Sequence, residues 1–167
     1  MAEGINRQKV NSLLAMAQIK KPPVDVKRIA EELGFMVVPY PFDDKKRGIL
    51  HIDPAKGDKV IGVNETHPKV MRRFTIAHEI GHFLNGHQHY EKTFIDDETK
   101  YYDPHFRQEK EADMFAAELL MPKKWLEVDV QKIGLEAKGL AKKYQVSEQA
   151  MWIRLTSTGL ARKYSSR

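Results

Sequence analysis

"FTIAHEIGHFLNGH", which runs from Phe74 to His87, places three histidines and one glutamate within fourteen residues. His78 and His82 are four residues apart, so on an α-helix they lie about 40° apart on one face, a turn above one another. Both imidazoles can therefore reach one metal ion at about 2.0–2.1 Å without any bend in the helix. Glu79 points beside such an ion, where it can take a proton from a metal-bound water. This spacing predicts a catalytic zinc site carried by a single helix.

The other positions of this segment are mostly apolar, so the helix is expected to be buried. They are Phe74, Ile76, Ala77, Ile80, Phe83 and Leu84. Unpaired buried charge costs several kcal/mol, and a bound dication would explain why a buried helix carries the pattern His-Glu-x-x-His. The competing interpretation, two surface histidines by chance, does not account for the apolar surround.

A zinc site of this kind needs a third protein ligand and leaves the fourth position to water. The metzincin pattern has a histidine six residues after the second one, with a glycine three residues before it. His87 lies only five residues after His82 and would be rotated away from it on a helix. It is therefore not expected to be a ligand.

The segment "EKEADMFAAELLMP" (109–122) offers a better third ligand. Glu109 and Asp113 are four residues apart and share a helical face, whereas Glu111 points about 200° away from Glu109. Glu109 is expected to bind the metal, and Asp113 to accept the second N–H of a ligand histidine and so fix its tautomer. This is the Glu-x-x-x-Asp arrangement of gluzincin peptidases. Small residues would let the helix approach the histidine helix closely: Ala112, Ala116 and Ala117.

An acidic stretch on a solvated helix face is the competing interpretation of the same segment. It would account for Glu111 and Glu118. It would also leave the zinc one ligand short.

Hydrolysis usually needs a second electrophile that stabilises the oxyanion. Three residues in the loop before the ligand helix are candidates: Tyr101, Tyr102 and His105. For the tyrosines, the competing interpretation is a packing residue with a hydrated hydroxyl.

Composition narrows the class of protein. The chain has 167 residues, of which 41% are hydrophobic, enough for one compact domain over residues 1–167, with a helical subregion at about 123–160. The absence of cysteine excludes disulfides, iron–sulfur clusters and cysteine-ligated zinc. Histidine and glutamate also suit Mn²⁺ and Fe²⁺, so neither is excluded as the metal. No apolar run approaches the roughly 20 residues of a membrane span, and no secretion signal is evident, so a cytoplasmic protein is expected.

The pattern of apolar and turn residues predicts an α+β fold, in which a small antiparallel or mixed sheet packs against the zinc-binding helix pair. Helices are expected at about 5–18, 26–33, 68–85 and 106–120, then two or three short ones, and strands at 35–40, 48–53 and 59–64. Residues 88–104 are polar and indicate a surface loop. "KVIGVN" (59–64) could present an open sheet edge along which an extended peptide binds, or an edge that the protein itself covers.

Two motifs of the sequence resemble those of a known family. "RRFTIAHEIGHFLNGH" together with "EADMFAAELLMP" resembles the ImmA/IrrE family of bacterial and phage metallopeptidases. The resemblance covers most of the chain, from "VDVKRIAEELGF" and "IGVN" to "LAKKYQVSEQAMWIRLTSTGL". It implies that His78, His82 and Glu109 are the zinc ligands and that Glu79 is the catalytic glutamate.

The resemblance also implies a biological role. Members of this family typically cleave, or trigger the loss of, a helix-turn-helix repressor, which switches on mobile-element or stress genes. The chain is therefore expected to be a site-specific zinc endopeptidase whose substrate is such a repressor. The residues by themselves reach only as far as a zinc hydrolase.

A second interpretation comes from residues 140–155, "LAKKYQVSEQAMWIRL", which have the shape of a helix-turn-helix. Val146 lies in the turn, and Ser147 is placed to cap the second helix. Residues 138–167 carry a basic excess, which can face nucleic acid or an acidic partner. These are seven basic residues against one acid, Glu148: Lys138, Lys142, Lys143, Arg154, Arg162, Lys163 and Arg167.

On this interpretation the protein is a DNA-binding or repressor-binding regulator with a non-catalytic metal site. The second helix, however, offers few base-reading side chains beyond Gln149 and Arg154. Trp152 is expected to pack against the zinc domain. A solvated surface explains the basic excess equally well.

Overall fold

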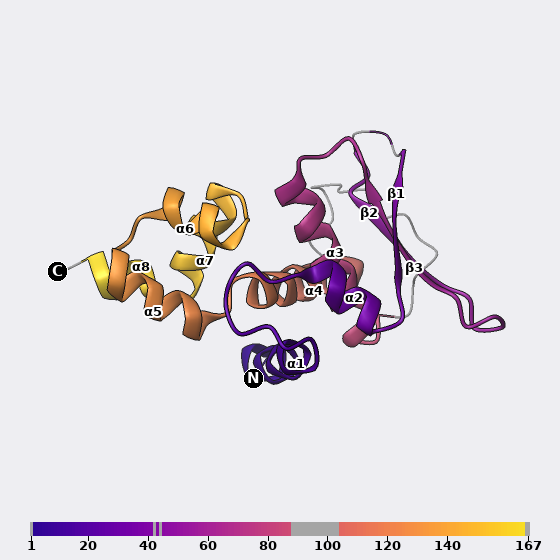
Figure 1. Ribbon diagram of the computed structural model, residues 1–167, viewed down its shortest axis with the longest axis horizontal. Helices are drawn as coiled ribbons and strands as arrows, with labels where there is room; N and C mark the ends of the chain where they lie inside the picture. Colours follow the sequence, from indigo (N-terminus) through magenta and orange to yellow (C-terminus); the bar gives the residue numbers. More distant parts are fainter. Residues whose placement is uncertain (1, 42, 44, 88–103, 166–167) are drawn as a thin grey trace.

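The computed structural model describes residues 2–41, 43, 45–87 and 104–165 (Figure 1). The chain forms the helices α1 (Ala2–Met16), α2 (Val26–Glu32), α3 (Lys69–Leu84), α4 (Pro104–Leu120), α5 (Lys123–Ile133), α6 (Ala137–Tyr144), α7 (Glu148–Ser157) and α8 (Leu160–Ser165). The strands are β1 (Met36–Tyr40), β2 (Gly48–Ile52) and β3 (Lys59–Asn64). The predicted α+β class is confirmed. Nearly all of the predicted loop at 88–104 lies outside the described residues.

The strands form a mixed sheet in the order β1-β3-β2, in which β3 is parallel to β1 and antiparallel to β2. The prediction that "KVIGVN" forms a sheet edge is wrong, because β3 has a hydrogen-bonded strand on each side. Ile61 pairs with Val37 of β1 and with Leu50 of β2, and its side chain is fully buried. The last four residues of β3 are buried, as the central position requires.

Helix α3 packs against strands β2 and β3 of the sheet and against α4 (Figure 1). Of its six predicted apolar positions, Ile76, Ala77 and Ile80 are buried. The other three are partly buried and pack against the core: Phe74, Phe83 and Leu84. The two helices are in close contact at Gly81. A Cβ at this residue would lie only 3.0 Å from Cδ1 of Phe115 and 3.2 Å from Cα of Ala112. Gly81 of α3 and the buried small residues of α4 together allow this approach.

Helices α5 to α8 lie at the opposite end of the molecule from the sheet (Figure 1). Helices α6 and α7 form the predicted helix-turn-helix-like unit, and the hydroxyl of Ser147 caps α7 by accepting a hydrogen bond from the Ala150 N–H. Leu140, Met151 and Leu155 are buried inside it. Among the described residues, no helix is both long and apolar enough to cross a bilayer.

Two expectations about this end of the molecule are wrong. Trp152 does not pack inside the protein, since 45% of its surface is exposed. Glu118 does not lie on a solvated face, since it is buried and forms an ion pair with the Arg154 guanidinium. The Arg154 Nε–H also donates to the Met121 carbonyl at 3.0 Å, so that this arginine joins α7 to the end of α4.

The close approach at Gly81 yields a test of the fold. We expect Gly81→Val to lower the free energy of unfolding by about 2 kcal/mol or more, because its branched side chain would be forced against Phe115 and Ala112. Met71→Val is the matched control, because Met71 lies on the same helix with 40% of its surface exposed. Urea unfolding should show a loss below about 1 kcal/mol for the control. Equal losses in the two variants would contradict the tight helix contact.

Candidate metal centre

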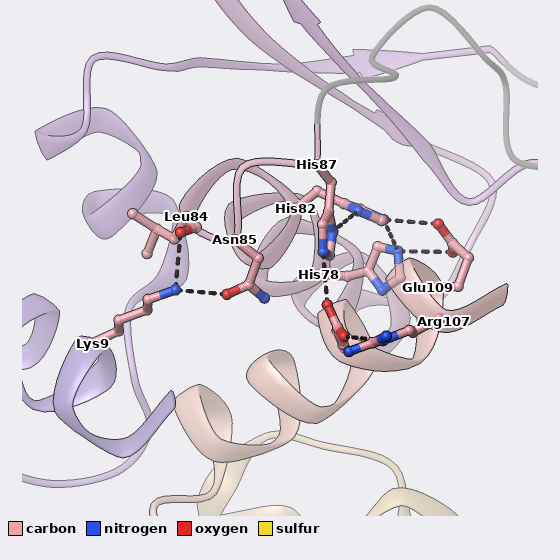
Figure 2. Close-up of polar contacts among 9 residues, drawn as sticks. Lys9, His78, His82, Leu84, Asn85, His87, Arg107 and Glu109 are labelled. Carbon is pink, nitrogen blue, oxygen red and sulfur yellow. Dashed lines mark hydrogen bonds and ion pairs between the residues drawn. The ribbon is translucent and has the colours of Figure 1, made fainter. Parts of the chain in front are cut away.

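Three potential ligand side chains converge between α3 and α4. His78 and His82 project from the same face of α3, and Glu109 faces them from α4 (Figure 2). The Glu109 carboxylate oxygens lie 3.2 Å from His78 Nε2 and 2.8 Å from His82 Nε2. One ligand atom from each residue fits within 4.8 Å of the others. The structure thus brings together the three residues that the sequence predicts as ligands.

The nitrogen atoms of His78 are arranged for metal binding. Its Nδ1 lies 2.8 Å from the Asp113 carboxylate, which can only accept a hydrogen bond from it. The proton of a neutral His78 is therefore on Nδ1, and the Nε2 lone pair faces the site. This is the contact predicted for Asp113, and carboxylate-bound histidines of this kind are common among metal ligands.

The donor set fits a divalent cation. The Nε2 atoms of His78 and His82 face one another at 2.9 Å, beside the Glu109 carboxylate. Two imidazole nitrogens and a carboxylate oxygen are the ligands of catalytic zinc sites that keep one position open. A cation between them would replace the proton that otherwise has to separate the two nitrogens.

The pKa values of the metal-free site reflect this crowding. Burial lowers the pKa of His78, but the hydrogen bonds to Asp113 and Glu109 outweigh burial and raise it to about 10. Burial raises the pKa of Glu109, but the hydrogen bonds from both histidines outweigh it and lower the pKa to about 2. The cluster therefore favours positive charge at the position where a cation would sit.

Glu79 differs from the other acidic groups of the site. It is only 3% exposed, and its Oε2 atom has no hydrogen-bond partner among the described residues. Burial raises its pKa to about 7, the charge of His78 opposes this, and the charge of Glu109 adds to it. The carboxylate lies beside the first residue of β2, since a Cβ at Gly48 would be 3.6 Å from Glu79 Oε1. A carboxyl group of this kind is suited to taking and releasing a proton near neutral pH.

His87 lies next to the candidate metal ligands, although its spacing in the sequence gave no indication of this. It is not one of the converging ligands, but its ring is not remote either, because its Nδ1 lies 2.9 Å from His82 Nδ1. Its Nε2 lies 3.0 Å from the Glu111 carboxylate. His87 is not rotated away from His82 as it would be on a continuous helix, because α3 ends at Leu84. Gly86 was the available signal, since a glycine after a helix commonly turns the chain back over its last turn.

The predicted oxyanion group is only partly described. His105 lies in the first turn of α4, four residues before Glu109 and therefore on the same face of that helix. Tyr101 and Tyr102 lie outside the described residues. The role of all three stays a prediction.

Comparison with known proteins identifies the class to which this fold and site belong. Residues 30–156 match the profile of the Peptidase M78 family, described as the IrrE N-terminal-like domain. The match spans most of the chain and includes both helices of the site. The chain therefore belongs to this metallopeptidase family, as the resemblance of the two motifs implied.

Comparison with solved structures shows similarity in fold only. A structure described as a Mycobacterium tuberculosis transcriptional regulator is similar in fold, with a TM-score of 0.66 and 14% sequence identity. The similarity covers 92% of this chain and 46% of that one, so this chain spans about half the length of that regulator. No curated protein sequence matches the chain.

The ligand assignment can be tested by comparing two glutamates of α4. We expect Glu109→Ala to lower zinc affinity at least about tenfold more than Glu111→Ala, because only Glu109 faces both His78 and His82. Competition with a chelator of known affinity measures both constants. Equal losses would remove Glu109 from the ligand set.

The burial of Glu79 predicts a pH effect on the metal-free protein. Its folded-state pKa is about 7 against an ordinary value of 4.5, so the fold favours the protonated form. That contribution is complete below about pH 4.5 and is lost as the pH rises to about 7. Between these pH values the wild type should lose about 3 kcal/mol of unfolding free energy that Glu79→Gln retains. Urea unfolding at both pH values measures the difference, and parallel losses in the two proteins would contradict it.

Proposed function

We propose that this protein is a zinc-dependent endopeptidase. The observation that carries the proposal is the convergence of His78, His82 and Glu109 beside Glu79, a buried carboxylate whose Oε2 has no partner among the described residues. A purely structural metal site has no use for such a carboxylate, whereas a hydrolase needs a base next to its water. Membership of a metallopeptidase family supports the same reaction.

The chain's own groups have separate roles in this mechanism. A zinc ion held by the three ligands supplies a Lewis acid and a water of lowered pKa. Glu79 takes the proton from the attacking water and passes it to the amine that leaves when the peptide bond breaks. Burial raises the pKa of Glu79 in the metal-free protein, which makes its carboxylate a stronger base than an exposed glutamate. Asp113 holds His78 in the tautomer that binds the metal.

Zinc is preferred to other metals on the chemistry of the ligands. Two imidazoles and one carboxylate with an open position form a usual catalytic zinc set. Mn²⁺ and Fe²⁺ also bind imidazole and carboxylate groups, so they remain alternatives. Metal analysis of the purified protein distinguishes them.

Strand β2 is the part of the sheet best placed to guide a peptide into the site. Among the described residues, only β3 pairs with it, so its other side is an edge. Its first residue, Gly48, lies against Thr75 and beside Glu79 on α3. An extended substrate that pairs with this edge through main-chain hydrogen bonds would pass in front of the Glu79 carboxylate. Strand β2 thus takes the peptide-binding role that the sequence suggested for β3, "KVIGVN".

The substrate that we propose is a helix-turn-helix repressor in the cytoplasm, cut to derepress mobile-element or stress genes. The support is the resemblance to the ImmA/IrrE family, together with the two motifs that carry it. A general protease in the cytoplasm would damage the cell. Cleavage is therefore expected at one exposed loop or linker of a specific partner.

DNA or repressor binding without catalysis is the second candidate function, and the helix pair α6–α7 is what favours it. Direct DNA reading is weakened because three basic residues of the C-terminal helices already pair with carboxylates of the protein. Arg154 binds Glu118, Lys143 binds Asp129, and Lys163 binds Glu127. The exposed Trp152 is also a poor reader of DNA bases. A salt-sensitive shift of a DNA duplex by the purified protein would revive this candidate.

The proposal predicts the effect of one substitution on peptide hydrolysis. Glu79→Gln should keep the fold and the bound zinc but lower the rate of repressor cleavage about 100- to 10,000-fold, because the amide cannot take the proton. The measurement is cleavage of the helix-turn-helix repressor encoded nearest to this gene, incubated with the zinc-loaded protein and followed by mass spectrometry.

The experiment compares Glu79→Gln with the wild type, and casein with the repressor. Cleavage by Glu79→Gln at the wild-type rate would show that the assigned role of Glu79 is wrong. Casein, an unfolded protein, is the control substrate, and rapid digestion of casein would contradict restricted specificity. An intact repressor, with casein also intact, would favour the binding function.

A further inference from the structure

The end of α3 folds back on the site in a defined turn. Gly86 has a φ of +67°, which places it in the left-handed region that glycine adopts without strain. The Gly86 N–H donates to the Phe83 carbonyl at 3.2 Å, and the His87 N–H donates to the His82 carbonyl at 3.1 Å. This pair of hydrogen bonds defines a Schellman motif, which brings the second residue after the helix cap over the last helical turn.

The motif places the His87 ring against the ring of His82. The ring centroids are 5.0 Å apart, and the two Nδ1 atoms are 2.9 Å apart. His87 is itself buried, although it follows the end of the helix. It contacts His82 on the side opposite to the Nε2 atom that faces His78 and Glu109 (Figure 2).

The protons of this arrangement can be assigned from the groups present. The Glu111 carboxylate accepts a hydrogen bond from the Arg107 Nε–H at 2.9 Å and lies 3.0 Å from His87 Nε2. An ionised carboxylate can only accept, so the His87 Nε2 carries a proton and donates it at 3.0 Å. The second ring nitrogen of His87 faces His82 Nδ1 at 2.9 Å, and only one of these two nitrogens can carry the proton between them.

The remaining protons then have one consistent arrangement. With its proton on Nε2, His87 presents the Nδ1 lone pair to His82. His82 must donate from its own Nδ1, which leaves the Nε2 lone pair of His82 directed at the metal position. Asp113 does the same for His78 by a different route. Each histidine of the pair thus has its own partner that fixes the tautomer.

We propose that His87 and Glu111 form a positioning pair that holds His82 in its metal-binding tautomer and orientation. The inference rests on the proposed metal site and adds to it two residues that bind no metal themselves. It also gives Gly86 a role, because another residue at that φ would be strained and would shift the His87 ring.

The test measures metal affinity, using Zn²⁺ in competition with a chelator and the visible spectrum of the Co²⁺-loaded protein. His87→Ala should lower zinc affinity about 10- to 100-fold while one metal still binds. Glu111→Ala should lower it by a smaller factor. The double variant should match His87→Ala alone, because Glu111 acts only through His87. Glu127→Ala is the matched control, since Glu127 forms an exposed ion pair with Lys163 far from the site.

His87→Asn separates positioning from a merely structural role. The Asn Oδ1 occupies the position of the histidine Nδ1 and can accept from His82, but its side chain is too short to reach Glu111. This variant should recover zinc affinity to within about threefold of the wild type. Adding Glu111→Ala to it should then have no further effect. The Co²⁺ spectrum should change in His87→Ala and return in His87→Asn.

The outcomes are distinct. If the wild type binds no zinc, the proposed metal site itself fails. If it binds zinc and His87→Ala binds equally well, only the positioning pair is overturned. Full additivity of His87→Ala and Glu111→Ala, or an affinity of His87→Asn as weak as that of His87→Ala, would overturn it as well. Urea unfolding of the metal-free variants identifies any loss that comes from instability of the fold.

Discussion

The contact between α3 and α4 at Gly81 is the constraint on which the site depends. The absence of a side chain there lets Phe115 and Ala112 come close to the backbone of α3. Glu109 lies one turn before Ala112 on α4, so the same approach brings its carboxylate to within 3.2 Å of the α3 histidines. A larger separation of the helices would leave the histidines with no third ligand. Packing of small residues therefore sets the chemistry of the site.

The site combines several ionisable groups, and burying any one of them alone as a charge would cost free energy. Glu79 is buried with an oxygen that has no partner among the described residues, and its pKa is raised to about 7. His78 and Glu109 compensate by pairing with one another, which holds one positive and the other negative. A cation would stabilise the whole group, because it replaces a shared proton and offsets both carboxylates. The charge arrangement of the metal-free site is therefore unfavourable, and a bound cation would stabilise the folded protein.

The C-terminal helices are attached to the ends of both site helices. The Arg73 Nε–H of α3 donates to the Gln145 carbonyl at 3.1 Å, at the turn between α6 and α7. Arg154 of α7 binds the Glu118 carboxylate and the Met121 carbonyl at the end of α4. These two partly buried arginines therefore attach the helix-turn-helix-like unit to the two helices that carry the site. Of the basic residues in the C-terminal segment, Arg154 is thus used for attachment within the protein.

The sequence by itself predicted the three candidate ligands, and it determined the α+β class and the family, because each depends on short-range spacing. Helical period places His78 beside His82 and Glu109 beside Asp113 wherever the helices end up. The order of the strands, the exposure of Trp152 and the burial of Glu118 were decided only by the tertiary structure, since each depends on which distant segment packs against it. The position of His87 depends partly on local sequence and partly on tertiary packing. Gly86 signalled a local turn, but only the packing of α3 on α4 shows that the turn places His87 between His82 and Glu111.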